Sequence, residues 1–501
     1  MSRVTTLLQT LADRGITLGV HCGALHYWHP KYSLTQEESG FFQERANEFV
    51  LEVMRTIEPP AAFPQYTAPL TFQQEYALEH FGDFYGGASL IHLSGPLDVN
   101  ALSKCIYALV QRHSSLRTKI RVTARGLQHH TSAPEYCELE VLDLEKFDAT
   151  SDGINSCYQN LLCKWYDAAA GTFDVKLLRP SESEHILAVF VDHLFSDYYS
   201  TSLLYHELWT SYCRLLRQQP EPVTGAPMQY SDYAILQRQT YPSWAGREQV
   251  YWNERLTNAV PIQFPGDDSR KIEPQVEIRN VRIPLPLSSS LRDVAQRIGV
   301  SISFVVVSLI SLAVAAWSGQ RKFTLPMTCS SRFERRHLDM IGYMPNFVPL
   351  RLELGDRDTF SHLCKRVSEE YLTGITHLSV GKPMDGGRRE LINAPFVQWF
   401  PTTFTEVVSP PRCRGDLEAL GLSIKVFDPG PFNLPSIGRR HKSNFLPGLM
   451  LWEEDGCIVG TGVFPIALCP PYRTRRRAPD LLHMATRIVR DMNTNVAAML
   501  T

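Results

Sequence analysis

The 501-residue chain has no excess of either charge and no apolar run long enough to span a membrane. Its formal net charge is −2, so neither nucleic acid nor an anionic membrane is indicated as a partner. The longest apolar stretch, residues 304–317, falls short of the roughly 20 residues that cross a bilayer, and we expect a buried helix there. The first residues lack the apolar core and cleavage site of a secretory signal. These absences predict a cytoplasmic protein.

The cysteines and the common cofactor motifs exclude further classes of protein. The 11 cysteines are odd in number, scattered along the chain and never spaced as CxxC, which argues against a disulfide framework and a structural zinc site. The sequence contains no HExxH pattern, Walker loop or GxGxxG motif. We therefore expect no metal and no cofactor bound by the chain itself.

Residues 186–200 are the most informative stretch. An apolar strand-like run ends at His193, Asp197 follows four residues later, and an amphipathic helical pattern begins directly after it. Both residues have a structural explanation, because aspartate is a common helix N-cap and a buried histidine is usually hydrogen-bonded. A histidine whose pKa lies near neutrality can also act as a general base.

The same stretch resembles the HHxxxDG motif of the condensation domains of nonribosomal peptide synthetases. The resemblance makes His193 the active-site histidine and Asp197 the motif aspartate. Asp192 stands where the motif has its first histidine, and Tyr198 where it has glycine. We expect Asp192 to lie on the same strand with its side chain on the opposite face, and its charge to raise the pKa of His193. Tyr198 should crowd the passage of the acceptor or the pantetheine arm.

Further stretches resemble the same family, in the family's order. They are an opening motif at residues 69–76, an RHxxLRT motif at 112–118, a YxDYA marker at 230–234 and an R…IGxFxN block at 331–346. In relatives the arginine of this last block pairs with the motif aspartate, so the resemblance makes Arg332 the partner of Asp197. Asn346 matches the asparagine of the block and is assigned a structural role. Beyond residue 354 the resemblance weakens.

Residues 1–57 have the pattern of helix, hairpin and helix. Two strand-like runs, 16–20 and 24–28, flank His21-Cys22-Gly23 as a turn, with helical spacing before and after them. The segment resembles tubulysin-type N-terminal docking domains, in which the hairpin edge receives the C-terminal tail of an upstream protein. An exposed strand edge suits that role. The alternative, from the residues alone, is a capping subdomain packed on the next domain.

The resemblance implies a mixed α/β (α+β) fold with two chloramphenicol-acetyltransferase-like lobes in a V-shaped arrangement. We expect a helix-hairpin-helix docking domain at 1–57, a linker at 58–67, an N-terminal lobe at 68–245 and a C-terminal lobe at 246–501. The lobe boundary rests on the resemblance alone. Two local predictions concern the second lobe: Ser288, Ser289 and Ser290 cap a helix that begins near Leu291, and the basic run 473–477 is a solvated loop.

The implied function is that of a freestanding condensation enzyme. It would transfer the acyl or peptidyl group of a carrier-bound thioester to an amine or hydroxyl and form an amide or ester. The donor carrier protein would belong to an upstream synthetase, and the C-terminal tail of that synthetase would bind residues 1–57. The acceptor would be held by a second carrier protein or be a soluble small molecule, and phosphopantetheine of the carriers would hold the substrates. We expect no nucleic acid and no membrane as partners. A catalytically impaired recruitment module is the alternative, and an acyltransferase on a small molecule outside assembly lines is a third hypothesis.

Overall fold

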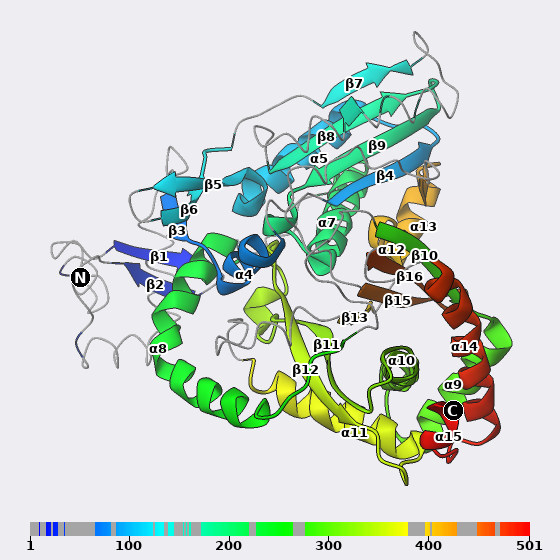
Figure 1. Cartoon of the computed structure of the whole chain (residues 1–501). Coiled ribbons are helices and arrows are strands. Elements are labelled where there is room, and N and C mark those ends of the chain that lie inside the picture. Colours follow the sequence, from blue (N-terminus) through cyan, green and yellow to red (C-terminus); the bar gives the residue numbers. More distant parts are fainter. Residues whose placement is uncertain are drawn as a thin grey trace.

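The computed structural model describes the greater part of the chain beyond residue 65 and a hairpin before it (Figure 1). The described ranges are 17–21, 24–28, 66–81, 87–123, 126–134, 139–144, 172–219, 227–263, 276–378, 396–400, 403–427, 448–465 and 471–500, with residues 10, 35, 154, 157, 160 and 161. These residues form one six-stranded, one five-stranded and one three-stranded sheet, with a separate two-stranded hairpin.

The five-stranded sheet forms the first lobe. Its order is β14-β4-β9-β8-β7, from β4 (Gly87–Ser94), β7 (Glu140–Asp143), β8 (Phe173–Arg179), β9 (Glu184–Val191) and β14 (Ser423–Val426). The central strand β9 is buried on both faces from His185 onward, which explains its apolar run from Ile186 to Val191. One face packs Leu187 and Val189 against α5 (Val99–Arg112) and α7 (Tyr198–Leu216), and the other packs Ala188 and Phe190 in a second cluster.

The six-stranded sheet forms the second lobe. Its order is β10-β16-β15-β13-β11-β12, from β10 (Val276–Ile283), β11 (Lys322–Ser330), β12 (Pro345–Glu353), β13 (Phe396–Trp399), β15 (Gly448–Glu454) and β16 (Cys457–Pro465). Helices α9 (Leu285–Ile298), α10 (Ile302–Ser318), α11 (Phe360–Ile375), α14 (Pro471–Arg490) and α15 (Ala497–Leu500) accompany it.

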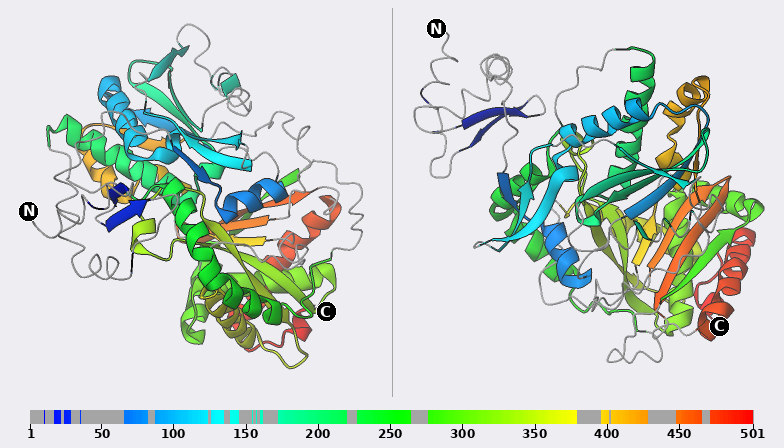
Figure 2. Two further views of the ribbon diagram at one scale, coloured as in Figure 1. Left: turned by 90° about the vertical axis from the view of Figure 1, so that its left-hand side faces the viewer. Right: turned by 90° about the horizontal axis from the view of Figure 1, so that it is seen from above.

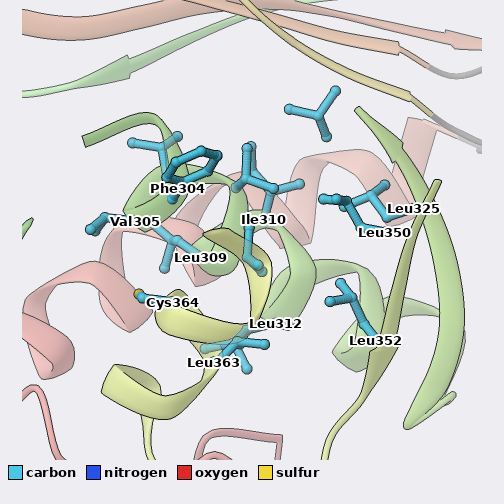
Figure 3. Close-up of a cluster of buried hydrophobic side chains, with 14 of the residues drawn as sticks. Phe304, Val305, Leu309, Ile310, Leu312, Leu325, Leu350, Leu352, Leu363 and Cys364 are labelled. Atoms are coloured by element: carbon cyan, nitrogen blue, oxygen red, sulfur yellow. The ribbon is translucent and has the colours of Figure 1, made fainter. Parts of the chain in front are cut away.

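The predicted buried helix at 304–317 is confirmed as α10, the centre of the second-lobe core (Figure 3). Leu309 and Leu312 of α10 lie among Leu325 of β11, Leu350 of β12 and Leu363 of α11, all with no measurable exposure. No single described helix meets the length and hydropathy of a membrane span; α9 and α10 meet them only as a pair bent by 106°.

Two local predictions for the second lobe were wrong. Ser288, Ser289 and Ser290 lie inside α9, which begins at Leu285 because Pro286 fits its first turn. The hydroxyl of Ser288 donates instead to the carbonyl of Ile283, at 2.8 Å. The basic run 473–477 lies in α14, where a continuous helix replaces the expected loop.

The two lobes are not contiguous in sequence. Residue 245, where we expected the boundary, lies within the 26-residue helix α8 (Tyr230–Arg255). The chain later returns to the first lobe through α12 (Phe404–Val408), α13 (Pro411–Ala419) and β14, which pairs with β4. Trp209 of α7 donates to the carbonyl of Val408 at 2.8 Å and anchors this return. The first-lobe sheet is therefore completed by a strand from the last fifth of the chain.

The three-stranded sheet and the hairpin complete the described structure. The sheet has the order β3-β6-β5, from β3 (Tyr66–Pro69), β5 (Thr118–Thr123) and β6 (Gly126–Thr131), and α4 (Phe72–Phe81) follows β3. The predicted hairpin is confirmed as antiparallel β1 (Thr17–His21) and β2 (Ala24–Trp28), set to one side of the two lobes in Figure 2. The helices predicted around the hairpin lie outside the described residues.

Candidate active site

His193 begins a short 3₁₀ turn, η3 (His193–Phe195), two residues beyond the end of β9. Its ring nitrogen Nδ1 lies 2.8 Å from the carbonyl oxygen of Ser196. A carbonyl only accepts hydrogen bonds, so Nδ1 carries the proton. In the neutral ring Nε2 is then the basic nitrogen, which is the tautomer that a general base at this atom requires.

The surroundings of His193 keep the ring neutral. Burial lowers the pKa of His193 below its usual value of 6.5, against the opposing effects of the hydrogen bond to Ser196 and the charge of Asp197. Tyr343 meets the imidazole edge-on, with ring centroids 5.4 Å apart. The side chain is therefore unprotonated near pH 7, ready to accept a proton.

Asp192 does not act as we expected. It lies in the turn and not on the strand, and its carboxylate caps η3 by accepting the N–H of Leu194 at 2.9 Å. Burial raises the pKa of Asp192 from 3.8 to about 6. The prediction that its charge raises the pKa of His193 was wrong, because burial of the imidazole dominates and the charge that counteracts it belongs to Asp197.

Asp197 and Arg332 form a buried ion pair between the lobes. Arg332 Nη2 lies 3.0 Å from Asp197 Oδ1 and 3.1 Å from Oδ2. Asp197 also caps α7 through the N–H of Ser200, at 2.7 Å, and accepts the N–H of Met344 at 3.2 Å. Arg332 Nη1 donates to the carbonyls of His337 and Met340. Each charge is thus compensated by several polar partners, as burial requires.

Close packing completes this junction. The hydroxyl of Ser200 donates to the carbonyl of Gly342 at 2.9 Å, and the N–H of Gly342 lies 3.0 Å from the same hydroxyl. A Cβ added at Gly342 would lie 2.2 Å from Cδ2 of Tyr230. The glycine of the R…IGxFxN block is therefore required by the approach of the Tyr230 ring.

Asn346 is the second residue of β12 and is buried. Its side chain accepts the N–H of Phe347 at 2.9 Å and donates to the hydroxyl of Ser331 at 3.4 Å. Gln73 of α4 donates to the same hydroxyl at 3.2 Å. Asn346 therefore holds the segment that carries Arg332, a structural placement.

A buried polar network behind the active-site turn was missed by the sequence analysis. Gln74 Nε2 donates to the carbonyl of Leu194 at 2.7 Å, and Gln74 Oε1 lies 2.7 Å from His129 Nε2. His129 Nδ1 lies 3.1 Å from the hydroxyl of Ser231, and burial lowers the pKa of His129 to about 3. The only signal in the sequence was the glutamine of the opening motif.

Tyr198 reaches across to the second lobe. Its ring centroid lies 4.2 Å from that of Phe400, with the planes 32° apart. Sequence reasoning predicted crowding at this position but did not identify Phe400. A cavity of about 170 Å³ lies elsewhere, between α7 and α13, and is lined by Trp209, Arg214 and Cys413 among others.

Comparison with known proteins supports the family resemblance. A model of the condensation domain matches residues 65–382. The chain is 28% identical over 294 residues to chondramide synthase cmdD of Chondromyces crocatus, covering 57% of this chain and 7% of that protein. Malpinin synthetase of Mortierella alpina is 24% identical over 443 residues, covering 80% and 5%. The chain thus spans only a small part of these curated relatives.

Solved structures resemble the fold closely. The X-domain from teicoplanin biosynthesis aligns with a TM-score of 0.70 and 18% identity, covering 88% of this chain and 98% of that chain. The first condensation domain of the CDA synthetase aligns with a TM-score of 0.61 and 16% identity, covering 86% and 98%. These similarities confirm the predicted mixed α/β, two-lobed fold.

Proposed function

Since the chain belongs to the condensation-domain family, we propose that it transfers a carrier-bound acyl or peptidyl thioester to an amine acceptor, forming an amide in nonribosomal or hybrid peptide synthesis. A hydroxyl acceptor, giving an ester, is the related chemistry. One observation carries the catalytic assignment: the hydrogen bond from His193 Nδ1 to Ser196 presents Nε2 as a base in a partly buried, neutral ring.

The reaction follows from that tautomer. As the acceptor amine attacks the thioester carbonyl, His193 Nε2 takes its proton, and the new C–N bond forms a tetrahedral intermediate. When the intermediate collapses, the C–S bond breaks and the imidazolium returns the proton to the thiolate of the leaving phosphopantetheine. A well-placed general base of this kind contributes roughly 10²–10⁴-fold to the rate.

Four residues position the groups around His193 without contacting substrate: Asp192, Asp197, Arg332 and Gln74. Asp197 and Arg332 hold the start of α7 against the second lobe, and Gln74 fixes the carbonyl of Leu194 beside His193. Asp192 caps the turn in which His193 lies. A 1 Å misplacement of a catalytic group can lower a rate about 100-fold, so these contacts matter for chemistry without touching substrate.

The proposed partners are two carrier proteins with phosphopantetheine arms. One delivers the acyl group and the other delivers the acceptor, although a free amine could take the place of the second carrier protein. The β1–β2 hairpin supports the docking role of residues 1–57, since within the described chain these two strands pair only with each other. A tail bound there would raise the local concentration of its carrier protein.

Intact-protein mass spectrometry of an acyl-loaded carrier protein tests the proposal. The chain, with an amine acceptor, should convert the loaded carrier to free carrier and amide, and His193→Ala should lower the rate by about 10²-fold or more. His206→Ala, in the same lobe on α7, is the matched control and should retain activity. The pH profile of kcat/KM should rise with pH and level off above a midpoint below 6.5, because the pKa of His193 is lowered.

A recruitment module is the second candidate, and two observations favour it. Asp192 and Tyr198 depart from the motif, and Tyr198 contacts Phe400 beside the site. The similar X-domain from teicoplanin biosynthesis has been solved in complex with OxyB. Equal, slow unloading by the native chain and His193→Ala, despite measurable carrier binding, would support this candidate over catalysis.

A further inference from the structure

Tyr230 is the first residue of α8, and its side chain is almost fully buried. It belongs to one hydrophobic cluster with Leu194 and Phe195 of η3 and with Tyr343, which lies between β11 and β12. The turn η3 begins at His193, and the ring of Tyr343 meets the imidazole of His193 edge-on. The cluster therefore joins two parts of the chain that surround the proposed base. The reaction described above assigns no role to Tyr230.

The hydroxyl of Tyr230 makes two hydrogen bonds. It donates to the backbone carbonyl of Tyr343 at 2.5 Å, which uses its one proton. Its oxygen lies 2.8 Å from the hydroxyl of Thr71, so the Thr71 hydroxyl is the donor in that bond. Burial raises the pKa of Tyr230 well above its usual value of 10, and the hydroxyl keeps its proton at all ordinary pH values. Tyr230 therefore fixes the backbone of the residue whose ring contacts His193.

The ring of Tyr230 packs on the active-site turn itself. Its centroid lies 6.4 Å from that of Phe195, the last residue of η3, with the ring planes at 81°. The ring of His129, from the polar network behind the turn, stacks on Tyr230 at 5.7 Å and 29°. Both separations fall in the range of aromatic contacts. One side chain thus supports both the turn that carries His193 and the backbone of Tyr343.

We propose that Tyr230 is a positioning residue for His193, which acts through its hydroxyl on Tyr343. The hydroxyl fixes the carbonyl of Tyr343, and the ring of Tyr343 then holds the imidazole in place. Without the hydroxyl, that carbonyl loses a buried hydrogen bond and the segment that carries the ring shifts. The inference rests on the proposed acyl transfer and adds a residue that acts on the base without touching substrate.

Tyr230→Phe tests the proposal, because it removes the hydroxyl and keeps the ring that packs beside Gly342. With an acyl-loaded carrier protein and an amine acceptor, kcat should fall about 10-fold, since a displaced base slows the chemical step. KM should change by less than about 2-fold, because no contact with substrate is removed.

Tyr212 of α7 provides the matched control. It is as deeply buried as Tyr230, and its hydroxyl accepts the backbone N–H of Asp98 at 2.9 Å. Tyr212→Phe therefore also removes a buried hydroxyl that bonds to backbone, but this one has no contact with Tyr343. The variant should keep the native kcat. Equal losses of kcat in Tyr230→Phe and Tyr212→Phe would mean that a general loss of stability lowers the rate, and the proposal would be wrong.

The pKa of His193 is a readout that needs no reaction, and NMR titration of the imidazole measures it. The groups that act on the ring are the carbonyl of Ser196, the charge of Asp197 and, from the second lobe, the ring of Tyr343. Burial is the largest effect and lowers this pKa. A shift of Tyr343 admits water, so the pKa should rise toward 6.5 in Tyr230→Phe and stay native in Tyr212→Phe. The midpoint of the kcat/KM profile should rise with it.

A double-mutant cycle tests the route through Tyr343. Tyr343→Leu removes the ring that contacts His193 and should lower kcat at least as much as Tyr230→Phe does. If the hydroxyl acts through that ring, the double variant should lose no more activity than Tyr343→Leu alone. Losses that multiply in the double variant would show that Tyr230 acts by another route.

The two readouts separate this proposal from the proposed function. A folded Tyr230→Phe with native kcat and a native His193 pKa would overturn the proposal, and so would a lower kcat with an unchanged pKa. If the native chain transfers no acyl group to any acceptor, the proposed function fails. The pKa of His193 then still decides the positioning, because an unchanged value in Tyr230→Phe would refute it.

Discussion

Two consecutive residues, Asp197 and Tyr198, join the first lobe to the second by opposite physical means. Asp197 binds Arg332, whose side chain is 2% exposed, in a junction with several further hydrogen bonds. Tyr198 packs against Phe400 with the ring planes tilted by 32°, and both side chains are only partly buried. A buried charge tolerates little displacement, because losing its partner leaves it uncompensated. A partly exposed aromatic contact can separate at small cost. The charged contact is therefore expected to contribute more to stability than the aromatic one.

The largest expected effect comes from breaking the charged contact. Arg332→Met should lower the free energy of unfolding by about 3–5 kcal/mol, because Asp197 then stays buried without its cation. Urea denaturation followed by circular dichroism measures the loss. Arg336→Met, which removes a solvent-exposed pair with Glu334, is the control and should change stability by no more than about 1 kcal/mol. Similar losses for the two variants would show that the inter-lobe pair carries no special weight.

Asp192 allows a test of buried charge without an ion pair. The pKa of Asp192 is about 6 in the folded state, against the ordinary value of 3.8. The ionised carboxylate is therefore disfavoured in the folded state, and the free energy of unfolding falls as the pH rises from about 4 to about 6. Asp192→Asn keeps an oxygen to accept the N–H of Leu194 and should be more stable at pH 7 by about 1–3 kcal/mol, at about 1.4 kcal/mol per pKa unit.

Thermal unfolding at several pH values measures this difference. The variant and the native chain should be equally stable near pH 3, where Asp192 is protonated in both states, and should diverge between pH 4 and about 6. A constant difference across that range would rule out the buried carboxylate as its cause.

An added methyl group at the charged junction should change stability by about as much as Asp192→Asn, but in the opposite direction. Gly342→Ala should lower the free energy of unfolding by about 1–3 kcal/mol, because the new Cβ would lie within 2.2 Å of the buried Tyr230 ring. Gly246→Ala in α8 meets no atom within 4 Å and should be neutral or stabilising. Chemical denaturation of both variants checks the contrast; a tolerated Gly342→Ala would mean that the ring yields readily.

The smallest effect should come from the aromatic contact. Tyr198→Leu should lower the free energy of unfolding by about 0.5–1.5 kcal/mol, which is what an aromatic pair usually contributes in addition to the burial of its surface. Tyr198→Phe should lower it by less. Differential scanning calorimetry of both proteins measures this. A loss as large as that of Arg332→Met would contradict the expected ranking of the two contacts.

The sequence predicted more of the second lobe's core than of the lobe boundaries. An apolar run as long as residues 304–317 is stable only when it is buried, and it forms the buried helix α10. The chain's return to the first lobe at residues 404–426 left no such signal, because α13 and β14 are short and β14 is only partly buried. A strand of four residues carries too little hydrophobic pattern to reveal which sheet it joins.

The sequence by itself determined the residues of the central motif and, through their order, the family and the expected pairing of Asp197 with Arg332. Those assignments depend on local residue types and spacing. Only the tertiary structure decided that Gln74 supports the carbonyl of Leu194, that Tyr343 flanks His193 and that Tyr198 meets Phe400. Gln74 and Leu194 are 120 residues apart in the sequence, and the other two pairs are farther apart still. Local spacing carries no information about such partners, because packing and strand register bring them together only once both sheets have formed.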